Sequence, residues 1–459
     1  MAGEGLPDRG GRMENCVVPV CNGRLTWIVR GENPFMRKKI GLLLAGVGVV
    51  TGSLLLFPGC LKDHVTESYQ LYEPVYSLKS AVLAGINGDP GTPVGQTGQI
   101  YVKGSYIFLN DPNKGIHIYD NSDPSHPVQT AFLNIPGNLN IGIRNNILYA
   151  DMYADVLSID ITNVHQVKIL GMLHGFFTSR QFTSDSNYVI TNWVVKDTSV
   201  TVVPQGYVLI PNTTYYTYNV PGVYDLAAAF ATSTSQSGTG TAGSEAVMTL
   251  VGDYMYAIPE EHTVGVVHIA DSTNPTLVLS DASGFDLETM FPIQGNLLVG
   301  SKEGVFVYSI SNPAQPTEVG EFKHGTACDP VIANSSYAYV TLRSGTDCGG
   351  AANELDVLDA QDLSNTIQLA SYPMTSPTGL CLDGSLLFVC DSTVVKVFDA
   401  SDPGNLQLLS SVPVNSPADV IAANHVMLVA APDGLYQFDY TDPRNIMQLS
   451  FVGVNHSKS

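Results

Sequence analysis

Basic residues are scarce in this 459-residue sequence, which has 21 Lys and Arg against 42 Asp and Glu and a formal net charge of −21. Nucleic acids are bound through basic stripes, so this charge balance argues against a nucleic-acid partner. Charged residues of both signs make up only 14% of the chain, whereas Gly (43), Pro (27) and Tyr (22) are frequent. Few charges, many turn formers and many ring side chains favour an all-β fold over a helical bundle.

Motifs of common enzymes and metal sites are also missing. The sequence contains no G-x-S-x-G, H-E-x-x-H, C-x-x-C or P-loop motif, each of which fixes the spacing of reactive side chains or phosphate-binding amides. His324, Cys328 and Cys348 supply three candidate metal ligands but no fourth, and structural zinc sites use four. The sequence therefore predicts no particular catalytic centre and leaves the identity of any metal unknown.

Residues 36–60 have the pattern of a bacterial export signal. Met36 is followed by three basic residues, an uncharged stretch of 18 residues over 40–57, and then Pro-Gly before Cys60. This order is typical of a signal peptide, and a cysteine directly after the small residue resembles the lipobox of bacterial lipoproteins. The resemblance implies that residues 36–59 are removed and that a lipid on Cys60 anchors the protein to a membrane. An uncleaved anchor is the alternative, because the apolar stretch approaches the length of a bilayer span.

The segments on either side of this signal are expected to lie outside the folded domain. Residues 1–35 precede a complete signal, so we interpret them as an extension from a start codon assigned too early. Residues 60–97 are expected to form a tether. Leu61 follows the lipidation site where inner-membrane lipoproteins often carry an acidic residue, so the resemblance favours the outer membrane.

A short motif of the form D-x-S/T-D/N-P recurs along the rest of the chain. Four of the six intervals between successive copies are 38 to 40 residues, one is 50 and one is 111. Each copy follows a short apolar strand that is itself preceded by a hairpin, so one unit supplies four short antiparallel strands. Such units, repeated about every forty residues, are typical of a β-propeller. The copies, three of them degenerate, begin at residues 120, 160, 271, 309, 359, 399 and 439.

The motif itself has a mechanical interpretation. Its Asp or Ser is expected to accept backbone N–H groups in a tight turn, and its Pro to end the strand. The units GIHIYDNSDPSHP, ELDVLDAQDLSN and VVKVFDASDPGN resemble the LVIVD-repeat family of bacterial extracytoplasmic propeller proteins. The resemblance covers roughly residues 98–455, and it implies an all-β propeller and surface or periplasmic residence. It implies almost no biochemistry.

The number of blades depends on the segment between the second and third clear units. Tyr188 follows Ile147 by 41 residues, just as Ile147 follows Tyr106. The segment after Tyr188 can form a hairpin but lacks the turn motif. We therefore expect either eight blades, one of them degenerate, or seven blades plus an irregular insertion at about 190–245.

Two cysteines are predicted to form a disulfide. Cys328 opens the innermost strand of one unit, and Cys348 lies in the following loop, which is about ten residues longer than its equivalents. In an oxidising compartment, a bond closing such a loop stabilises a fold by about 3 kcal/mol. Cys381 and Cys390 flank a hairpin turn. For them the sequence leaves two interpretations open, a disulfide and two buried thiols.

Polar residues stand at the head of the strand that opens each unit. That strand is innermost in a propeller, so these side chains are expected to line a water-filled central channel. A sharper hypothesis is that Glu288, Asp329 and Asp419 converge on a polar ligand or a cation such as Ca²⁺, with Arg343 as a nearby counter-charge. The head positions are Gln99, Asn140, Glu288, Asp329, Thr378 and Asp419.

These observations favour a non-catalytic protein over an enzyme. The first hypothesis is a cell-envelope lipoprotein whose propeller binds or scaffolds a protein or glycan partner. The alternative is a hydrolase or lyase with carboxylates at the central channel, and the fold alone does not choose between them. No cofactor is predicted apart from the Ca²⁺ of the channel hypothesis.

Overall fold

The computed structural model contains two compact units, the larger of which comprises residues 73–194 and 219–459. The smaller unit comprises residues 1–72 and 195–218. In its described part, the side-chain amide of Gln70 donates a hydrogen bond to Asp197 at 3.5 Å. The structure describes residues 65–88, 91–202, 241–244, 246–282, 286–323, 330–345 and 350–455.

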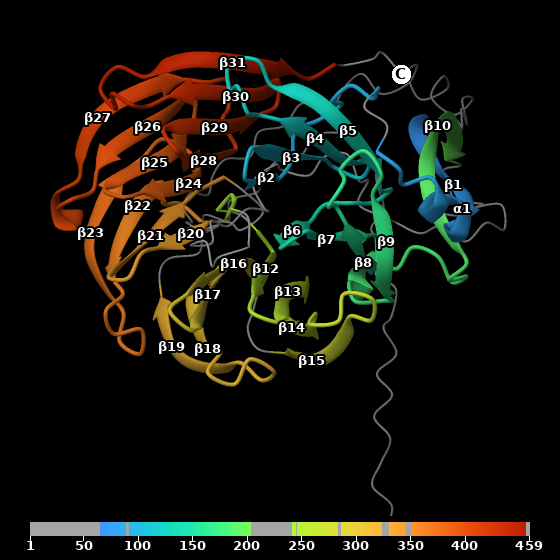
Figure 1. The fold of residues 1–459 in the computed structure, drawn as a ribbon, viewed down its shortest axis with the longest axis horizontal. Helices are drawn as coiled ribbons and strands as arrows, with labels where there is room; N and C mark the ends of the chain where they lie inside the picture. Colours follow the sequence, from blue (N-terminus) through green and yellow to red (C-terminus); the bar gives the residue numbers. More distant parts are fainter. Residues whose placement is uncertain are drawn as a thin grey trace, which may run out of the picture. The chain divides into compact units, whose positions relative to one another are not determined.

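Seven antiparallel sheets, the blades, follow one another around a ring in the larger unit, each built from four consecutive strands (Figure 1). Within each blade the strands pair in chain order. The first strands of successive blades contact one another, which makes them the innermost strands. Blades 1 to 3 consist of β2 (Ile100–Lys103), β3 (Tyr106–Asp111), β4 (Gly115–Asp120) and β5 (Val128–Asn134); β6 (Ile141–Arg144), β7 (Ile147–Met152), β8 (Asp155–Asp160) and β9 (Lys168–Leu173); and β12 (Met248–Val251), β13 (Tyr254–Glu260), β14 (Thr263–His268) and β15 (Thr276–Ala282).

The remaining blades repeat this order without a further insertion of comparable length. Blade 4 consists of β16 (Leu287–Ile293), β17 (Asn296–Ser301), β18 (Gly304–Ser309) and β19 (Thr317–Lys323). Blade 5 consists of β20 (Val331–Ala333), β21 (Tyr337–Leu342), β22 (Glu354–Asp359) and β23 (Ile367–Pro373). Blade 6 consists of β24 (Pro377–Asp383), β25 (Leu386–Asp391), β26 (Val394–Asp399) and β27 (Gln407–Pro413), and blade 7 of β28 (Asp419–Ala423), β29 (Val426–Ala431), β30 (Gly434–Asp439) and β31 (Met447–Gly453).

Seven blades plus an insertion is therefore the correct one of the two expected alternatives. The segment proposed as a degenerate eighth blade does form a strand, β10 (Tyr188–Val202), but β10 pairs with β1 (Val65–Leu78) in a separate two-stranded sheet. Within the larger unit, the N–H of Lys79 donates to the carbonyl of Asn187 at 2.8 Å. The hydroxyl groups of Ser77 and Thr191 lie 3.1 Å apart. The local strand preference was correct, but the pairing partner lies more than a hundred residues away in the sequence.

Helical structure is confined to short pieces in the described residues. They are α1 (Lys79–Ala84), η1 (Thr178–Arg180) and η2 (Pro403–Asn405). No helix in this part of the chain is long and apolar enough to cross a membrane.

The repeated D-x-S/T-D/N-P motifs form the turns between the third and fourth strands of the blades. In blade 1, Oδ1 of Asp120 accepts hydrogen bonds from the hydroxyl of Ser122 at 2.6 Å and from its N–H at 2.9 Å. These two bonds hold the pKa of Asp120 below its usual value. The same two bonds join Asp271 to Thr273 at 2.6 and 2.9 Å. The predicted turn role of the motif is confirmed, and it explains why so many acidic residues stand at one position of the repeat.

Blades 1 and 7 meet where the ring closes, each with its own set of consecutive strands. The side-chain amides of Asn121 and Gln437 make two hydrogen bonds to each other, at 2.9 and 2.8 Å. The hydroxyl of Thr97 donates to the carbonyl of Ala431 at 2.6 Å. A shared apolar cluster completes this seam, and its members include Ile100, Ile107, Leu109, Ile421, Leu428 and Leu435.

Candidate functional site

Polar side chains at the heads of the innermost strands form the starting point for a functional site. Glu288 is half-buried, and the other described head residues are buried. Buried polar groups need hydrogen-bond partners, so the partners of these head residues show which contacts stabilise this face of the ring. The described head residues are Gln99 before β2, Asn140 before β6, Glu288 in β16, Thr378 in β24 and Asp419 at the start of β28.

The residues of the cation hypothesis are spread over separate blades. Glu288 lies in blade 4, Asp419 in blade 7, and Arg343 directly follows β21 of blade 5. Hydrogen bonds reach the carboxyl group of Asp419 from Ser244, a residue that the sequence did not single out. Convergence on a cation stays a prediction. The predicted residues outside the described ranges are Cys60, Cys328, Asp329 and Cys348.

Asp419 is fully buried, and its partner comes from a segment 175 residues away. Its Oδ1 accepts hydrogen bonds from the N–H and the hydroxyl of Ser244, both at 3.2 Å. The hydroxyl oxygen of Ser244 in turn accepts the N–H of Leu380 at 2.8 Å. Burial raises the pKa of Asp419 to about 7, although hydrogen bonds from Ser244 and from the N–H of Val420 oppose the rise. This carboxyl group therefore changes charge near neutral pH, far above the usual range of an aspartate.

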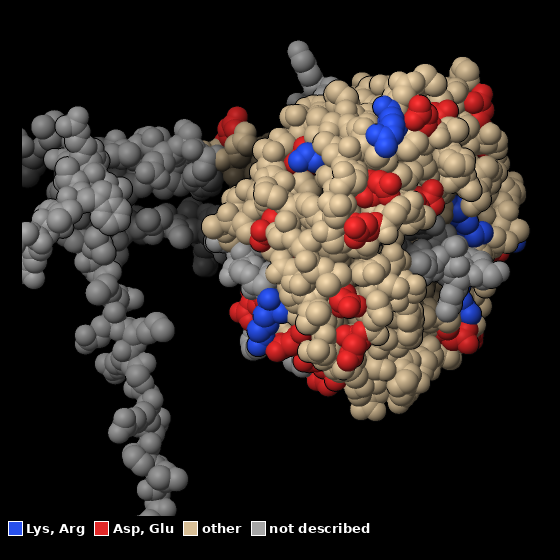
Figure 2. Space-filling view, turned by 90° about the vertical axis from the view of Figure 1, so that its left-hand side faces the viewer, with Lys and Arg blue, Asp and Glu red and all other residues tan. Residues whose placement is uncertain are grey.

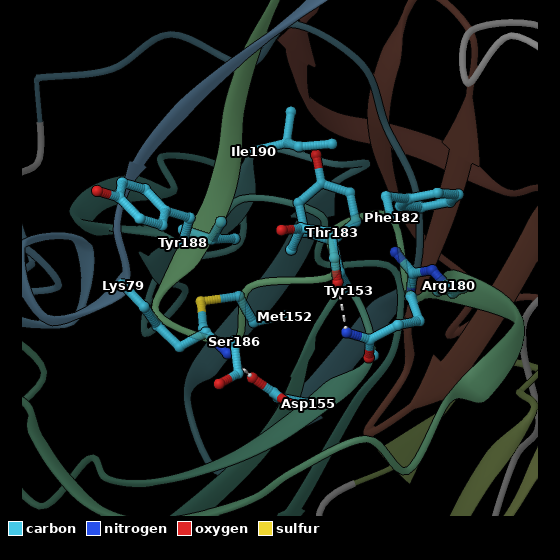
Figure 3. A pocket seen from close by; sticks show the side chains of 13 residues that line it. Lys79, Met152, Tyr153, Asp155, Arg180, Phe182, Thr183, Ser186, Tyr188 and Ile190 are labelled. Atoms are coloured by element: carbon cyan, nitrogen blue, oxygen red, sulfur yellow. Dashed lines mark hydrogen bonds and ion pairs between the residues drawn. The ribbon is translucent and has the colours of Figure 1, made fainter. Parts of the chain in front are cut away.

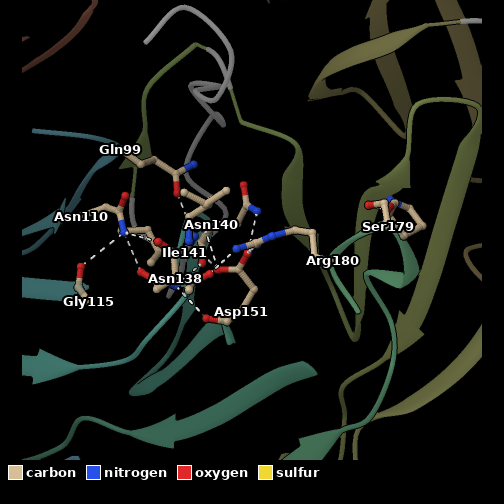
Figure 4. Close-up of polar contacts among 12 residues, drawn as sticks. Gln99, Asn110, Gly115, Asn138, Asn140, Ile141, Asp151, Ser179 and Arg180 are labelled. Atoms are coloured by element: carbon tan, nitrogen blue, oxygen red, sulfur yellow. Dashed lines mark hydrogen bonds and ion pairs between the residues drawn. The ribbon is translucent and has the colours of Figure 1, made fainter. Parts of the chain in front are cut away.

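A second buried carboxylate, Asp151, follows the same design with more donors (Figure 4). It accepts the N–H groups of Leu139 and Asn140, both at 2.8 Å. The side-chain amides of Asn138 and Asn140 donate to it at 2.8 and 3.0 Å. The guanidinium of Arg180 forms an ion pair with its other oxygen. Five donors surround a side chain with no exposed surface, so Asp151 fixes the loop before β6 rather than facing a ligand.

The Asp151 network continues from blade 2 into blade 1. The side-chain amide of Asn110 donates to Oδ1 of Asn138 at 2.6 Å. Oε1 of Gln99 accepts the N–H of Ile141, the first residue of β6, at 2.7 Å. The two innermost strands are therefore joined through side chains, as Figure 4 shows.

Asp151 belongs to a device that recurs at the end of the second strand of several blades. In blade 1, Asp111 accepts the N–H of Gly95 at 2.7 Å and lies 3.4 Å from the ring nitrogen of His117. In blade 6, Asp391 accepts the N–H of Ser376 at 2.7 Å and pairs with Lys396 at 2.6 Å. Each aspartate holds the loop that leads into its own innermost strand. The sequence carried a sign of this device, an acid closing the FLND and FVCD strands and within YADM.

A small pocket lies beside Arg180, where residues 180–190 pack against blade 2 (Figure 3). Lys79 and Asp155 form an ion pair at 2.6 Å on its wall, and both side chains are largely buried. The guanidinium of Arg180 lies 5.9 Å from the ring centroid of Tyr153, within the range of a cation–π contact. The ring of Phe182 meets that of Tyr153 edge-on, at 5.5 Å between centroids. The pocket thus combines charged donors and acceptors with aromatic faces.

Two segments of the chain match the LVIVD repeat family, residues 94–131 and 298–324. The first segment contains β2 to β4 and the start of β5, and the second contains β18 and β19 with the end of β17. Both therefore fall on strands of single blades in the seven-bladed ring. The chain carries LVIVD repeats. The resemblance inferred from the sequence is confirmed at these two segments, each of which lies within one blade.

Several solved structures are similar to this chain at low sequence identity. A protein from Lactobacillus plantarum is 12% identical with a TM-score of 0.50, covering 78% of this chain and 96% of its own. Sqt1 of Saccharomyces cerevisiae is 8% identical with a TM-score of 0.49, covering 80% and 87%. The periplasmic gluconolactonase of Pseudomonas aeruginosa is 13% identical with a TM-score of 0.45, covering 79% and 97%. At 12% identity, the likeness to the Lactobacillus plantarum protein shows the fold alone. No curated protein matches the chain.

One further group on the LVIVD ring has the residue types of a metal site. Glu261 and His262 form the turn between β13 and β14, and Asp286 precedes β16; their ligand atoms lie within 4.8 Å of one another. The group is largely exposed, Nδ1 of His262 accepts the N–H of Asp286 at 3.2 Å, and Lys302 lies 3.7 Å from Asp286. These contacts account for its geometry without an ion.

The cysteines of blade 6 are two buried thiols. Neither Cys381 nor Cys390 forms a disulfide, and Cys381 is paired across the hairpin with Phe388 rather than with Cys390. The Sγ atom of Cys381 accepts the N–H of Ala422 at 3.2 Å, which joins blades 6 and 7. Of the two interpretations left open by the sequence, the structure has the unbonded one.

Proposed function

We propose that this LVIVD protein is an exported, lipid-anchored protein of the cell envelope that acts as a non-catalytic binding or scaffold propeller for a protein or glycan partner. The observation that carries the proposal is that the buried carboxylates bind groups of the protein itself. Asp111, Asp151 and Asp391 each accept backbone N–H groups of a loop and also lie beside a basic side chain. Their bonding capacity holds the blades together.

In a hydrolase or lyase, at least one of these carboxylates would have to be accessible to a substrate. A general acid or base must have an oxygen within hydrogen-bond reach of the substrate. Asp151 is enclosed by its donors, and the described donors to Asp419 come from Ser244 and Val420 of the same chain. The arrangement therefore supports binding by the surface around these loops more than chemistry at the ring centre.

The pocket beside Arg180 is the part of that surface with the composition of a recognition site. A pocket that combines a small number of charged groups with aromatic rings suits hydroxyl-rich or peptide ligands. The rings supply contact area, and the paired charges supply directed hydrogen bonds. Lys79 and Arg180 are already paired with Asp155 and Asp151, so the pocket suits a neutral ligand better than a strongly anionic one.

Membrane attachment rests on residues 36–60, which lie outside the described residues. Basic residues, an apolar stretch and Gly-Cys in that order support export followed by lipidation of Cys60. The outer membrane is proposed as the site of residence because Leu61 is not acidic. A lipid anchor would keep the ring at the membrane surface without a spanning helix.

Site-specific photo-cross-linking in intact envelopes tests the binding function. A photoreactive phenylalanine analogue is placed at Ser186, an exposed residue lining the pocket, and in a matched variant at Ser311, an exposed residue in the turn after β18. We expect a discrete adduct of a protein or glycan from the Ser186 variant and none from the Ser311 variant. Equal labelling at both positions, or none at Ser186, would contradict a partner on this face. Substrate turnover by the purified protein, lost on Asp419→Asn substitution, would favour the enzyme instead.

A further inference from the structure

Residues 241–244 lie across the seam at which the ring closes. Residues 241–242 form β11 (Thr241–Ala242), which pairs with β2 as a fifth strand on the inner edge of blade 1. Ser244 bonds to Asp419 of blade 7 and to the N–H of Leu380 of blade 6. Figure 1 shows β11 near the centre of the ring. This short segment therefore connects three blades that are otherwise distant from it in the sequence.

The fit of this segment against blades 6 and 7 depends on two glycines. A Cβ atom on Gly243 would overlap Oδ2 of Asp419, and a Cβ atom on Gly379 would overlap its Oδ1. The carboxyl group is thus enclosed by backbone on both sides. A larger residue at position 243 would displace either the segment or the Asp419 side chain, which has no free space on the Gly379 side.

The enclosure suits the neutral form of the carboxyl group. Both donors from Ser244 reach Oδ1, and among the described residues no hydrogen-bond donor reaches Oδ2. Within the same part of the chain no Lys, Arg or His forms an ion pair with Asp419. An ionised carboxylate can accept about four hydrogen bonds, so a buried one whose Oδ2 has no partner is costly.

The titratable groups on the elements packed against Asp419 do not supply the missing stabilisation. In β24 the thiol of Cys381 is fully buried, and burial raises its pKa to about 12, with Asp419 adding to the rise. It therefore stays protonated across the neutral range. At the end of β25, Asp391 is paired with Lys396. Residues 241–244 and β29 carry no ionisable side chain.

We propose that the contact between Asp419 and Ser244 is a pH-sensitive latch, in which the neutral carboxyl group holds residues 241–244 against blades 6 and 7 and loss of its proton releases them. Release would admit water to both carboxylate oxygens, and this water would supply the hydrogen-bond donors that the seated form lacks. It would also expose the heads of β24 and β28 at the centre of the ring. The proposal does not depend on the identity of any partner.

The direction of the response follows from the sign of the pKa shift. The seated form has a pKa of about 7, and a released, hydrated Asp419 titrates near the ordinary value of an aspartate. The seated form therefore holds the proton more tightly; its advantage is complete below about pH 4 and is lost as the pH rises from there to 7. Between these two values the ratio of released to seated segment rises by about tenfold for each pH unit, and it levels off above pH 7, where both forms have lost the proton.

Hydrogen–deuterium exchange of the purified protein tests the latch at pH 6 and pH 8, with rates corrected for intrinsic exchange. The probes are the amide of Ser244, which donates to Asp419, and the amide of Leu380, which donates to Ser244. We expect the protection of both to be about tenfold lower at pH 8 than at pH 6, with no such change in the strands of blade 4. Equal protection at the two pH values would overturn the proposal.

Three variants assign the response to this contact. Asp419→Asn keeps the neutral shape and should remain protected at both pH values, whereas Gly243→Ala cannot seat and should be unprotected at both. Asp271→Asn, a matched control in an exposed turn of blade 3, should respond to pH as the unmodified protein does. A pH response that persists in Asp419→Asn would overturn the proposal, and so would full protection in Gly243→Ala. Should Gly243→Ala fail to fold, the comparison of Asp419→Asn with the unmodified protein still decides.

Discussion

Replacing Asp151 by Ala is the most direct test of how the polar face of the ring is held together. The change deletes the acceptor of five hydrogen bonds, including the ion pair with Arg180. Asp151 has no exposed surface, and the Arg180 side chain is 14% exposed. Water can therefore replace the lost acceptor only by entering the interior.

The magnitude follows from these partners. Removing one member of a buried ion pair costs about 3–5 kcal/mol, because the other charge is left without compensation. Part of that loss comes from the N–H groups of Leu139 and Asn140, since each buried donor left unsatisfied costs about 1–3 kcal/mol. We expect Asp151→Ala to lower the free energy of unfolding by about 3–5 kcal/mol. Asp151→Asn should cost less, because its side-chain oxygen still accepts the loop N–H groups.

Urea unfolding followed by circular dichroism measures the change. The matched control is Arg144→Ala, which breaks the pair of Arg144 with Asp253, whose side chains are 25% and 52% exposed. Exposed pairs contribute about 0.2–1 kcal/mol, so this control should stay close to the unmodified protein. If Asp151→Ala were no more destabilised than Arg144→Ala, the hydrogen bonds to Asp151 would not stabilise this face of the ring.

A double-mutant cycle with Asn121→Ala and Gln437→Ala should give a coupling energy of about 1 kcal/mol from denaturant unfolding, because the two amides bond mainly to each other. Purely additive losses would show that this pair does not stabilise the closure of the ring. Mass spectrometry of the envelope fraction should find the mature chain beginning at lipidated Cys60, and Cys60→Ala should leave the unlipidated precursor. Non-reducing peptide mapping of the exported protein should recover Cys328 joined to Cys348, and free alkylation of both in denaturant without reductant would rule out the bond.

The fold could be predicted from the sequence because its decisive features are local. The turn around Asp120 needs only Ser122, two residues away, to satisfy its carboxylate. Hairpins and turns of this kind repeat at a nearly constant interval, so periodicity alone gives the blade. The segment after Tyr188 was harder because strand preference does not name a partner. The residues that pair with it come from β1, which the sequence presents as a tether.

The candidate site was predictable only where its contacts are short in sequence. An acid at the end of the β3 and β25 strands, and one residue before the end of β7, could have been read from the repeat, since its partners are the loop amides nearby. The cation of Asp151 is Arg180, which comes from η1 after the last strand of blade 2, and Ser244, 175 residues distant, donates to Asp419. Asp419 was correctly placed at the head of β28, but its environment depends on that distant segment. Neither contact has a local pattern that reveals it.

The position of Ser244 connects the latch to the closure of the ring. A propeller whose blades are built from consecutive strands has one seam where the first and last blades meet without a covalent link. Here the amides of Asn121 and Gln437 join that seam at the third strands, and residues 241–244 join it at the innermost strands by pairing with β2 and bonding to Asp419. The same short segment therefore occupies the centre and fastens the seam. Releasing it would loosen blade 1 from blade 7 as well as expose the inner strand heads, so a proton on one carboxyl group can influence both the access to the ring centre and the stability of the ring.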